Sequence, residues 1–223
     1  MAYILNIHTA TETAIVTIAD DSVVLATLTN EETKQHAAFI HLAIDKLLKD
    51  QHLAIKDLDA IGVSSGPGSY TGIRVGLAAA KGLCFALNIP MITYNSLELM
   101  ALSAIDFAKD EKGFYCPMID ARRMEVYTAL YTSNEQELTA PSAMILNEDS
   151  FAQILRSGKV YFSGSGADKF KKIIKNPNAI FLPLVISPDS MAKLSFKKFN
   201  KNEFVEAAYF NPLYIKEFGT ILK

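Results

Sequence analysis

A glycine-rich stretch in the first half of the chain constrains its fold more than any other feature. Six of the eleven glycines lie between residues 62 and 82, in the segment GVSSGPGSYTGIRVGLAAAKG. Residues 60–65 predict a buried strand before the loop, and residues 72–87 predict a helix after it that ends at the sequence NIP. Backbone with so few side chains either cradles a phosphate or lets another polypeptide segment come close.

Strands and helices alternate along the whole chain, which predicts the α/β class. Apolar and β-branched runs predict strands at residues 3–10, 13–20, 22–29, 60–65, 91–95, 114–120, 124–131 and 159–164. Helical spacing and capping residues predict helices at residues 36–49, 72–87, 96–108, 166–175 and 187–199, with Pro188 at the start of the last one. The order of strands and helices in the second half therefore resembles that in the first half, although the pattern is less clear.

A polar, turn-forming segment at residues 109–113, KDEKG, predicts a domain boundary. A chain of 223 residues is long enough for two small domains that each bury a core. We therefore expect one domain over residues 1–108 and a smaller one over residues 109–204. We expect residues from about 205 to 223 to pack back on the first domain.

The composition excludes several classes of protein. Half of the residues are hydrophobic, but no run of about 18 apolar residues occurs, so we expect no membrane-spanning segment. The segment MAYILNIHTATET lacks the basic and apolar regions of a secretory signal. Cys84 and Cys116 lie far apart in apolar surroundings, and we interpret them as buried thiols rather than a disulfide. These features favour a cytoplasmic protein.

Charge is distributed unevenly along the chain. Residues 1–155 have a net charge of −9, and residues 156–223 have a net charge of +7. The basic residues of the second segment that lie on two predicted helices are Lys169, Lys171, Lys172, Lys175, Lys193, Lys197 and Lys198. We interpret them mainly as a solvated face, because nucleic-acid binding usually needs a more basic domain. We expect at most weak, salt-sensitive RNA binding by the isolated chain.

The glycine loop does not match the established nucleotide-binding motifs. A P-loop needs Lys followed by Ser or Thr directly after its last glycine, and a dinucleotide fingerprint needs G-x-G-x-x-G; neither pattern is present. A glycine loop between a strand and a helix still presents backbone N–H groups to an anion. The candidate nucleotide contacts are therefore His8, Gly66, Gly68, Ser69 and Thr71, of which Ser69 and Thr71 are also candidate helix caps.

The helix after the loop carries a ridge of small residues. Gly72, Gly76 and Ala80 recur every four residues. Glycine inside a helix costs about 1 kcal/mol relative to alanine, so two glycines need a compensating reason. Close packing of another element is such a reason. The residues alone leave packing within the chain and packing on a partner equally open.

We predict neither a metal site nor a catalytic site. Four histidines are present, but His36 and His41 are five residues apart and do not share a helix face. No HxxxH, HExxH or CxxC motif occurs. No nucleophile stands beside a base.

Charges of both signs lie at the turn of a predicted hairpin, at residues 120–127. One interpretation is a solvated turn whose surface ion pair contributes under about 1 kcal/mol. The other is a docking site or an anion contact. The sequence leaves both open.

Several segments together resemble one family. They are ILNIHTATETAIVTIAD, QHAAFIHLAIDKLLKD, LDAIGVSSGPGSYTGIRVGLAAAKGL, NIPMITYNSLELMA, IDARRMEVYTALY, FSGSGADKF and PLYIKEF. In this order and spacing they are similar to the TsaB (YeaZ) family of bacterial tRNA threonylcarbamoyladenosine synthesis. The resemblance covers nearly the whole chain and is strongest from Leu58 to Ala101. It implies the actin-like ATPase fold, with two ribonuclease-H-like domains.

The resemblance also implies a role and partners. The chain would be a non-catalytic dimerisation subunit that binds the paralogue TsaD, supports transfer of threonylcarbamoyl to N6 of adenosine 37 of tRNA, and works with the ATPase TsaE. It would form a homodimer when alone and meet tRNA through the complex. No cofactor would be tightly bound, although ATP or ADP would contact the interface with TsaD. The implied partner interface consists of His36, Ile40, Ile44, Leu47, Gly72, Arg74, Val75, Gly76, Ala79, Ala80 and Leu83.

One position departs from the family pattern. The family usually has an acidic residue where this chain has His8. Histidine is a poor ligand for Mg²⁺, which prefers oxygen, so we expect no ATP hydrolysis by this chain alone. The alternative functions are a metallopeptidase of the glycoprotease type, which needs metal ligands, and an actin-like-fold small-molecule kinase, which needs an acid near position 8.

Overall fold

The chain forms two compact units. The structure, a computed structural model, describes residues 1–32, 35–183 and 186–216. The first unit contains Met1–Ser96 and Ser187–Leu213, and the second contains Leu97–Ile186 together with the segment that begins at Tyr214. Each unit is built on its own five-stranded sheet.

The sheet of the first unit combines hairpins with parallel strands. Its strands are β1 (Tyr3–His8), β2 (Ala14–Asp20), β3 (Val23–Asn30), β4 (Ala60–Ser64) and β5 (Met91–Tyr94), in the order β3-β2-β1-β4-β5. β1, β2 and β3 pair antiparallel, and β1, β4 and β5 pair parallel. These are the five strands that the apolar runs predict in this part of the chain.

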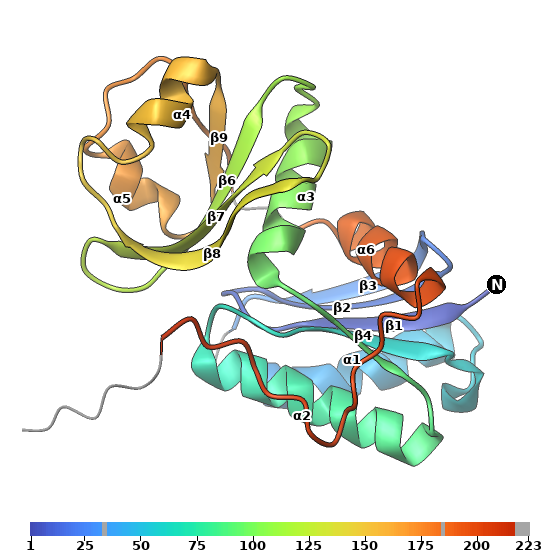
Figure 1. The fold of residues 1–223 in the computed structure, drawn as a ribbon. Coiled ribbons are helices and arrows are strands. Elements are labelled where there is room, and N and C mark those ends of the chain that lie inside the picture. The colour runs from blue at the N-terminus through green and yellow to red at the C-terminus, as the bar shows by residue number, and fades with distance from the viewer. Residues whose placement is uncertain (33–34, 184–185, 217–223) are drawn as a thin grey trace, which may run out of the picture. The chain divides into compact units, whose positions relative to one another are not determined.

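Helices cover both faces of this sheet (Figure 1). The helices α1 (His36–Asp50) and α2 (Tyr70–Leu87) pack on the face that carries Leu5 and Ile7. The helix α6 (Pro188–Asn200) packs on the other face, where Phe196 and Phe199 contact Ile4. A short 3-10 helix, η2 (Ile55–Asp57), precedes β4. Alternate residues of β1 therefore contribute to cores on opposite faces of the sheet.

The second unit repeats the topology of the first. Its strands are β6 (Phe114–Asp120), β7 (Glu125–Thr132), β8 (Glu137–Ile145), β9 (Val160–Ser163) and β10 (Ala179–Phe181), in the order β10-β9-β6-β7-β8. Three antiparallel strands are again followed by two parallel ones. Its helices are α3 (Ser96–Ala108), α4 (Ala152–Ser157) and α5 (Ala167–Lys171). α5 is shorter than the helix predicted at residues 166–175.

The two units differ from the predicted domains of residues 1–108 and 109–204. α3 groups with the second unit from Leu97 onward, and α6 groups with the first. The polar segment at 109–113 is a turn between α3 and β6 rather than the border between units. Amphipathic spacing predicts α6 as a helix, but it does not show which sheet α6 covers.

The segment after α6 packs on the first unit up to Leu213. Val205 bridges to Met91, and the Leu213 N–H donates to the Ser65 carbonyl over 2.8 Å. The Lys81 ammonium donates to the Phe210 carbonyl over 2.8 Å. Residues 214–216 group with the second unit, and residues 217–223 lie outside the described part of the chain.

Two further observations concern the composition. Over the described ranges, no helix has the length and apolar character needed to cross a membrane. Cys84 and Cys116 are both free and buried, and burial raises the pKa of Cys84 to about 11 and that of Cys116 to about 12.

Candidate functional site

The glycine ridge of α2 faces its own sheet. A β-carbon at Gly72 would collide with the Thr9 carbonyl oxygen, and one at Gly76 would collide with the Thr9 hydroxyl. The Thr9 hydroxyl also donates to the Gly72 carbonyl over 2.7 Å. The glycines therefore let α2 lie directly against the end of β1. Of the two alternatives left open for Gly72, Gly76 and Ala80, packing within the chain is sufficient to account for the ridge.

Most other residues of the expected interface also point inward. Ile40, Ile44 and Leu47 are buried in the core between α1, α2 and the sheet, and Ala80 is fully buried beside them. His36 is buried as well. These side chains position the two helices and have almost no exposed surface, although Ile40 and Ile44 are among the residues that line the two hollows described next.

A groove of about 390 Å³ lies between the outer sides of α1 and α2. Its lining consists of Ala37, Ile40, His41, Val75, Ala78, Ala79, Gly82 and Leu83. A second hollow of about 420 Å³ shares His41 and Leu83 with it and extends along α1 past Ile44 and Leu48. Four residues of the expected interface, Ile40, Val75, Ala79 and Leu83, therefore line one groove.

Gly82 is an exposed position of this groove. A β-carbon placed there would meet no atom within 4 Å. With Val75, Ala78 and Ala79 it forms a second stripe of small side chains, at the spacing i, i+3, i+4 and i+7. Sequence reasoning missed Gly82 and Ala78 because the Gly72–Gly76 ridge has the same kind of spacing. We call the first hollow with its Gly82 stripe the α1–α2 groove.

Large apolar side chains are exposed on the same two helices. Phe85, one turn after Gly82, is 90% exposed, and Leu42, next to His41, is 72% exposed. Arg74 is exposed too, and its guanidinium lies 4.2 Å from the centre of the Tyr70 ring. Large exposed apolar side chains on the helices that form an apolar groove are typical of a protein–protein contact surface.

The glycine loop is held rigidly at the start of α2. The Ser69 N–H donates to the Ala10 carbonyl over 2.7 Å, and the Ser69 hydroxyl accepts from the Gly72 N–H over 3.2 Å, which confirms Ser69 as the helix cap. The Gly66 carbonyl accepts from the Ser96 N–H over 2.9 Å. Gly66 has a φ of 105°, which an L side chain rarely adopts. Thr71 lies exposed in the first helical turn and is not the cap.

His8 lies at the end of β1 and is completely buried. Its Nε2 is 3.0 Å from the Thr11 hydroxyl. Burial, with a smaller effect from the charge of His36, lowers the pKa of His8 from 6.5 to about 3. The ring is therefore neutral near pH 7 and offers no positive charge to a phosphate. Of the expected nucleotide contacts, only the loop and the first turn of α2 remain suited to an anion.

The lowered pKa of His8 predicts an acid-sensitive stability. Between pH 6.5 and about 3 the unfolded chain binds a proton at His8 and the folded chain does not. The free energy of unfolding should therefore fall by up to about 1.4 kcal/mol per pH unit as the pH drops through this window. Urea unfolding of the wild type and His8→Gln at several pH values measures it. A difference between the two proteins that stays constant with pH would contradict the prediction.

The basic residues of the last third do not form one cluster within either unit. Lys169 and Lys171 belong to α5 in the second unit, whereas Lys193, Lys197 and Lys198 belong to α6 in the first. Some of these charges also have partners. Lys169 pairs with Asp120 at 2.7 Å and Lys198 with Glu203 at 3.3 Å. The basic residues of the last third are therefore divided between the two units.

Within the described residues, no group of three or more His, Cys, Asp or Glu side chains is arranged to hold a metal ion. His8 and His36 interact electrostatically, but no acidic or cysteine side chain joins them in such a group. His8 and His36 are buried, His41 lies on the exposed side of α1, and His52 lies in the exposed turn after α1.

Comparison with known proteins relates the chain to tRNA modification. The family model for TsaD, tRNA N6-adenosine threonylcarbamoyltransferase, matches residues 24–212. The tRNA threonylcarbamoyladenosine biosynthesis protein TsaB of Bacillus subtilis is 32% identical over 176 residues, which cover 78% of this chain and 75% of that protein.

Solved structures show the same fold. YeaZ from Pseudomonas aeruginosa superposes with a TM-score of 0.82 and 25% identity, over 96% of this chain and 100% of that one. An inorganic polyphosphate/ATP-glucomannokinase from Arthrobacter has a TM-score of 0.53 at 11% identity, over 91% of this chain and 100% of that chain, which places the chain in the actin-like ATPase fold. The two sheets with their shared strand order are the two ribonuclease-H-like domains of that fold. The chain belongs to the TsaB (YeaZ) family of tRNA threonylcarbamoyladenosine biosynthesis proteins.

Proposed function

We propose that this chain is a non-catalytic subunit that binds the paralogue TsaD through the α1–α2 groove. The observation that carries the proposal is the apolar groove in which a β-carbon at Gly82 would meet no other atom. An exposed apolar groove next to exposed apolar side chains is one of the marks of a protein–protein contact. The bound TsaD would transfer threonylcarbamoyl to N6 of adenosine 37 of tRNA.

The shape of the groove suits a helix of the partner. Ala78, Ala79 and Gly82 present little side-chain volume, so a partner helix can approach the backbone of α2 closely. Phe85, one turn after Gly82, supplies exposed apolar area, and its burial would contribute about 25 cal/mol for each Å² removed from water. A second copy of this chain would cover the same surface when TsaD is absent.

We assign the catalytic steps to the partner proteins rather than to this chain. A kinase of the same fold would need an acid at the end of β1 to organise Mg²⁺, and this position carries the buried, neutral His8. A metallopeptidase would need a set of metal ligands, and the described residues bring no such set together. Both alternatives are therefore less well supported than the role of a binding subunit.

We place a nucleotide contact at the glycine loop only within the complex. The segment from Gly66 to Thr71 leads into the positive end of α2, which favours an anion. ATP or ADP would reach this loop at the interface with TsaD, and TsaE would join the complex as its ATPase. The tRNA would be held by the assembled complex rather than by this chain alone.

Reconstitution tests the proposed function. This chain and the TsaD paralogue of the same genome are mixed and analysed by gel filtration, and threonylcarbamoyladenosine formation is followed with and without each protein. We expect co-elution, no ATP turnover by this chain alone, and product only when both proteins are present. Separate elution at micromolar concentrations, or equal product formation without this chain, would show that the proposal is wrong.

A further inference from the structure

Two consecutive arginines form the tip of the hairpin between β6 and β7. Arg122 and Arg123 have φ angles of 73° and 48°. This left-handed region is uncommon for residues other than glycine, asparagine and aspartate. The sequence therefore places two unfavourable residues side by side where Asn or Gly would fit with less strain. Such strain at a turn needs a reason other than folding.

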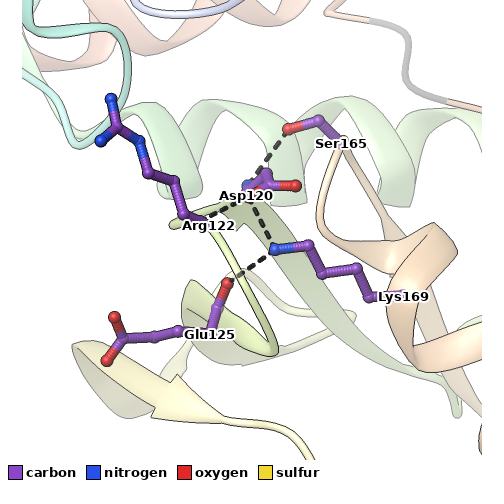
Figure 2. Close-up of polar contacts among 5 residues, drawn as sticks. All are labelled: Asp120, Arg122, Glu125, Ser165 and Lys169. Atoms are coloured by element: carbon purple, nitrogen blue, oxygen red, sulfur yellow. Dashed lines mark hydrogen bonds and ion pairs between the residues drawn. The ribbon is translucent and has the colours of Figure 1, made fainter.

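The backbone of the tip is fixed from both sides (Figure 2). The Arg122 N–H donates to the Asp120 carboxylate over 2.6 Å, and the Asp120 N–H donates to the Ser165 hydroxyl over 3.2 Å. Across the turn, the Glu125 N–H donates to the Arg122 carbonyl over 3.0 Å. The two arginines are therefore presented by an ordered turn.

The acidic side chains near the tip are already paired with lysines. The Lys169 ammonium lies 2.7 Å from the Asp120 carboxylate and also donates to the Glu125 carbonyl over 3.2 Å. The Lys216 ammonium lies 2.6 Å from the Glu125 carboxylate. Each of the two carboxylates thus has its own cation.

The positive charges of Arg122 and Arg123 take no part in these ion pairs. Both side chains are exposed, and in Figure 2 the guanidinium of Arg122 points away from the Asp120–Lys169 pair. Among the described residues, no carboxylate forms an ion pair with either guanidinium. The tip therefore carries two positive charges that the surrounding unit does not neutralise.

We propose that Arg122 and Arg123 contact phosphate groups of the tRNA held by the assembled complex. A guanidinium has a planar fork of donors that matches two phosphate oxygens, and it stays charged at every physiological pH. RNA is the anionic partner that the family's part in tRNA modification supplies. This inference rests on the proposed function, because the tRNA is bound by the complex with TsaD.

The double variant Arg122→Asn/Arg123→Gly tests the proposal. Both new residues adopt left-handed backbone readily, so the folded state should be as stable as in the wild type or more stable. The complex with TsaD should still assemble. Its affinity for tRNA at about 0.15 M salt should fall roughly tenfold, and the slope of log affinity against log salt should become flatter by about 1 to 2.

A matched variant removes two charges elsewhere in the same unit. Lys172→Asn/Lys175→Gln changes the net charge equally, and we expect its complex to bind tRNA within roughly twofold of the wild type. Fluorescence anisotropy at several salt concentrations measures all three complexes.

Three outcomes would overturn the proposal. Unchanged affinity and slope in the arginine variant would show that the tip does not contact RNA, and equal losses in both variants would show that only net charge matters. Loss of TsaD binding in the arginine variant alone would assign the tip to a protein surface. If the wild-type chain itself fails to bind TsaD, the proposed function fails first, which the assembly step shows separately.

Discussion

Replacing Gly72 with alanine is expected to destabilise the first unit by roughly 3 kcal/mol, whereas the same change at Gly82 is expected to stabilise it by up to about 1 kcal/mol. The β-carbon at position 72 would collide with the backbone carbonyl of Thr9, which cannot move without shifting β1 against α2. At position 82 the added carbon meets nothing, and alanine has the higher helix propensity.

Urea unfolding followed by circular dichroism compares the two variants with the wild type. Because both changes add one methyl group to the same helix, they control for each other. An unchanged unfolding midpoint in Gly72→Ala would contradict the assignment of this glycine to packing within the chain. A lower midpoint in Gly82→Ala would contradict the openness of the groove.

Gly82→Leu is expected to weaken binding of the TsaD paralogue at least about 100-fold while the chain stays folded. The leucine side chain would extend into the α1–α2 groove, and well-packed interfaces tolerate little added volume. Isothermal titration of the partner into each variant measures the effect. The unfolding midpoint, measured in parallel, separates a blocked groove from a damaged fold.

The control for this variant is Gln153→Leu, which adds an apolar side chain at an exposed position of α4 in the second unit. We expect it to bind the partner like the wild type. Gly76→Leu would not serve as a test, because its side chain would collide with the Thr9 hydroxyl inside the first unit. Normal binding by folded Gly82→Leu would place the partner elsewhere.

Secondary structure could be predicted well from the local pattern of apolar runs and helix-ending residues. The end of α2 illustrates this, because Asn88 adopts the left-handed conformation that terminates the helix after Leu87. The start of α6 at Pro188 follows from the fixed φ of proline. β8 was missed because most of its residues are exposed, so it lacks the apolar run that the other strands have. It is held by backbone pairing with β7 instead.

The sequence could not show which element the ridge of Gly72 and Gly76 packs against. Helical spacing shows that Gly72 and Gly76 share a face, but it does not show what that face meets. The answer depends on Thr9, which is more than sixty residues away in the sequence and comes close through the pairing of β1 with β4. The same limit applies to His8, whose complete burial follows from packing around the end of β1.

A fluorine label at position 85 tests the central claim, binding of TsaD at the α1–α2 groove, most directly. The chain has no tryptophan, so Phe85→Trp with 5-fluorotryptophan gives one resonance at a side chain that is 90% exposed beside Gly82. Titration with unlabelled TsaD paralogue should shift and broaden this resonance saturably, in step with complex formation on gel filtration. A resonance that stays at its free position while the complex forms would contradict the account.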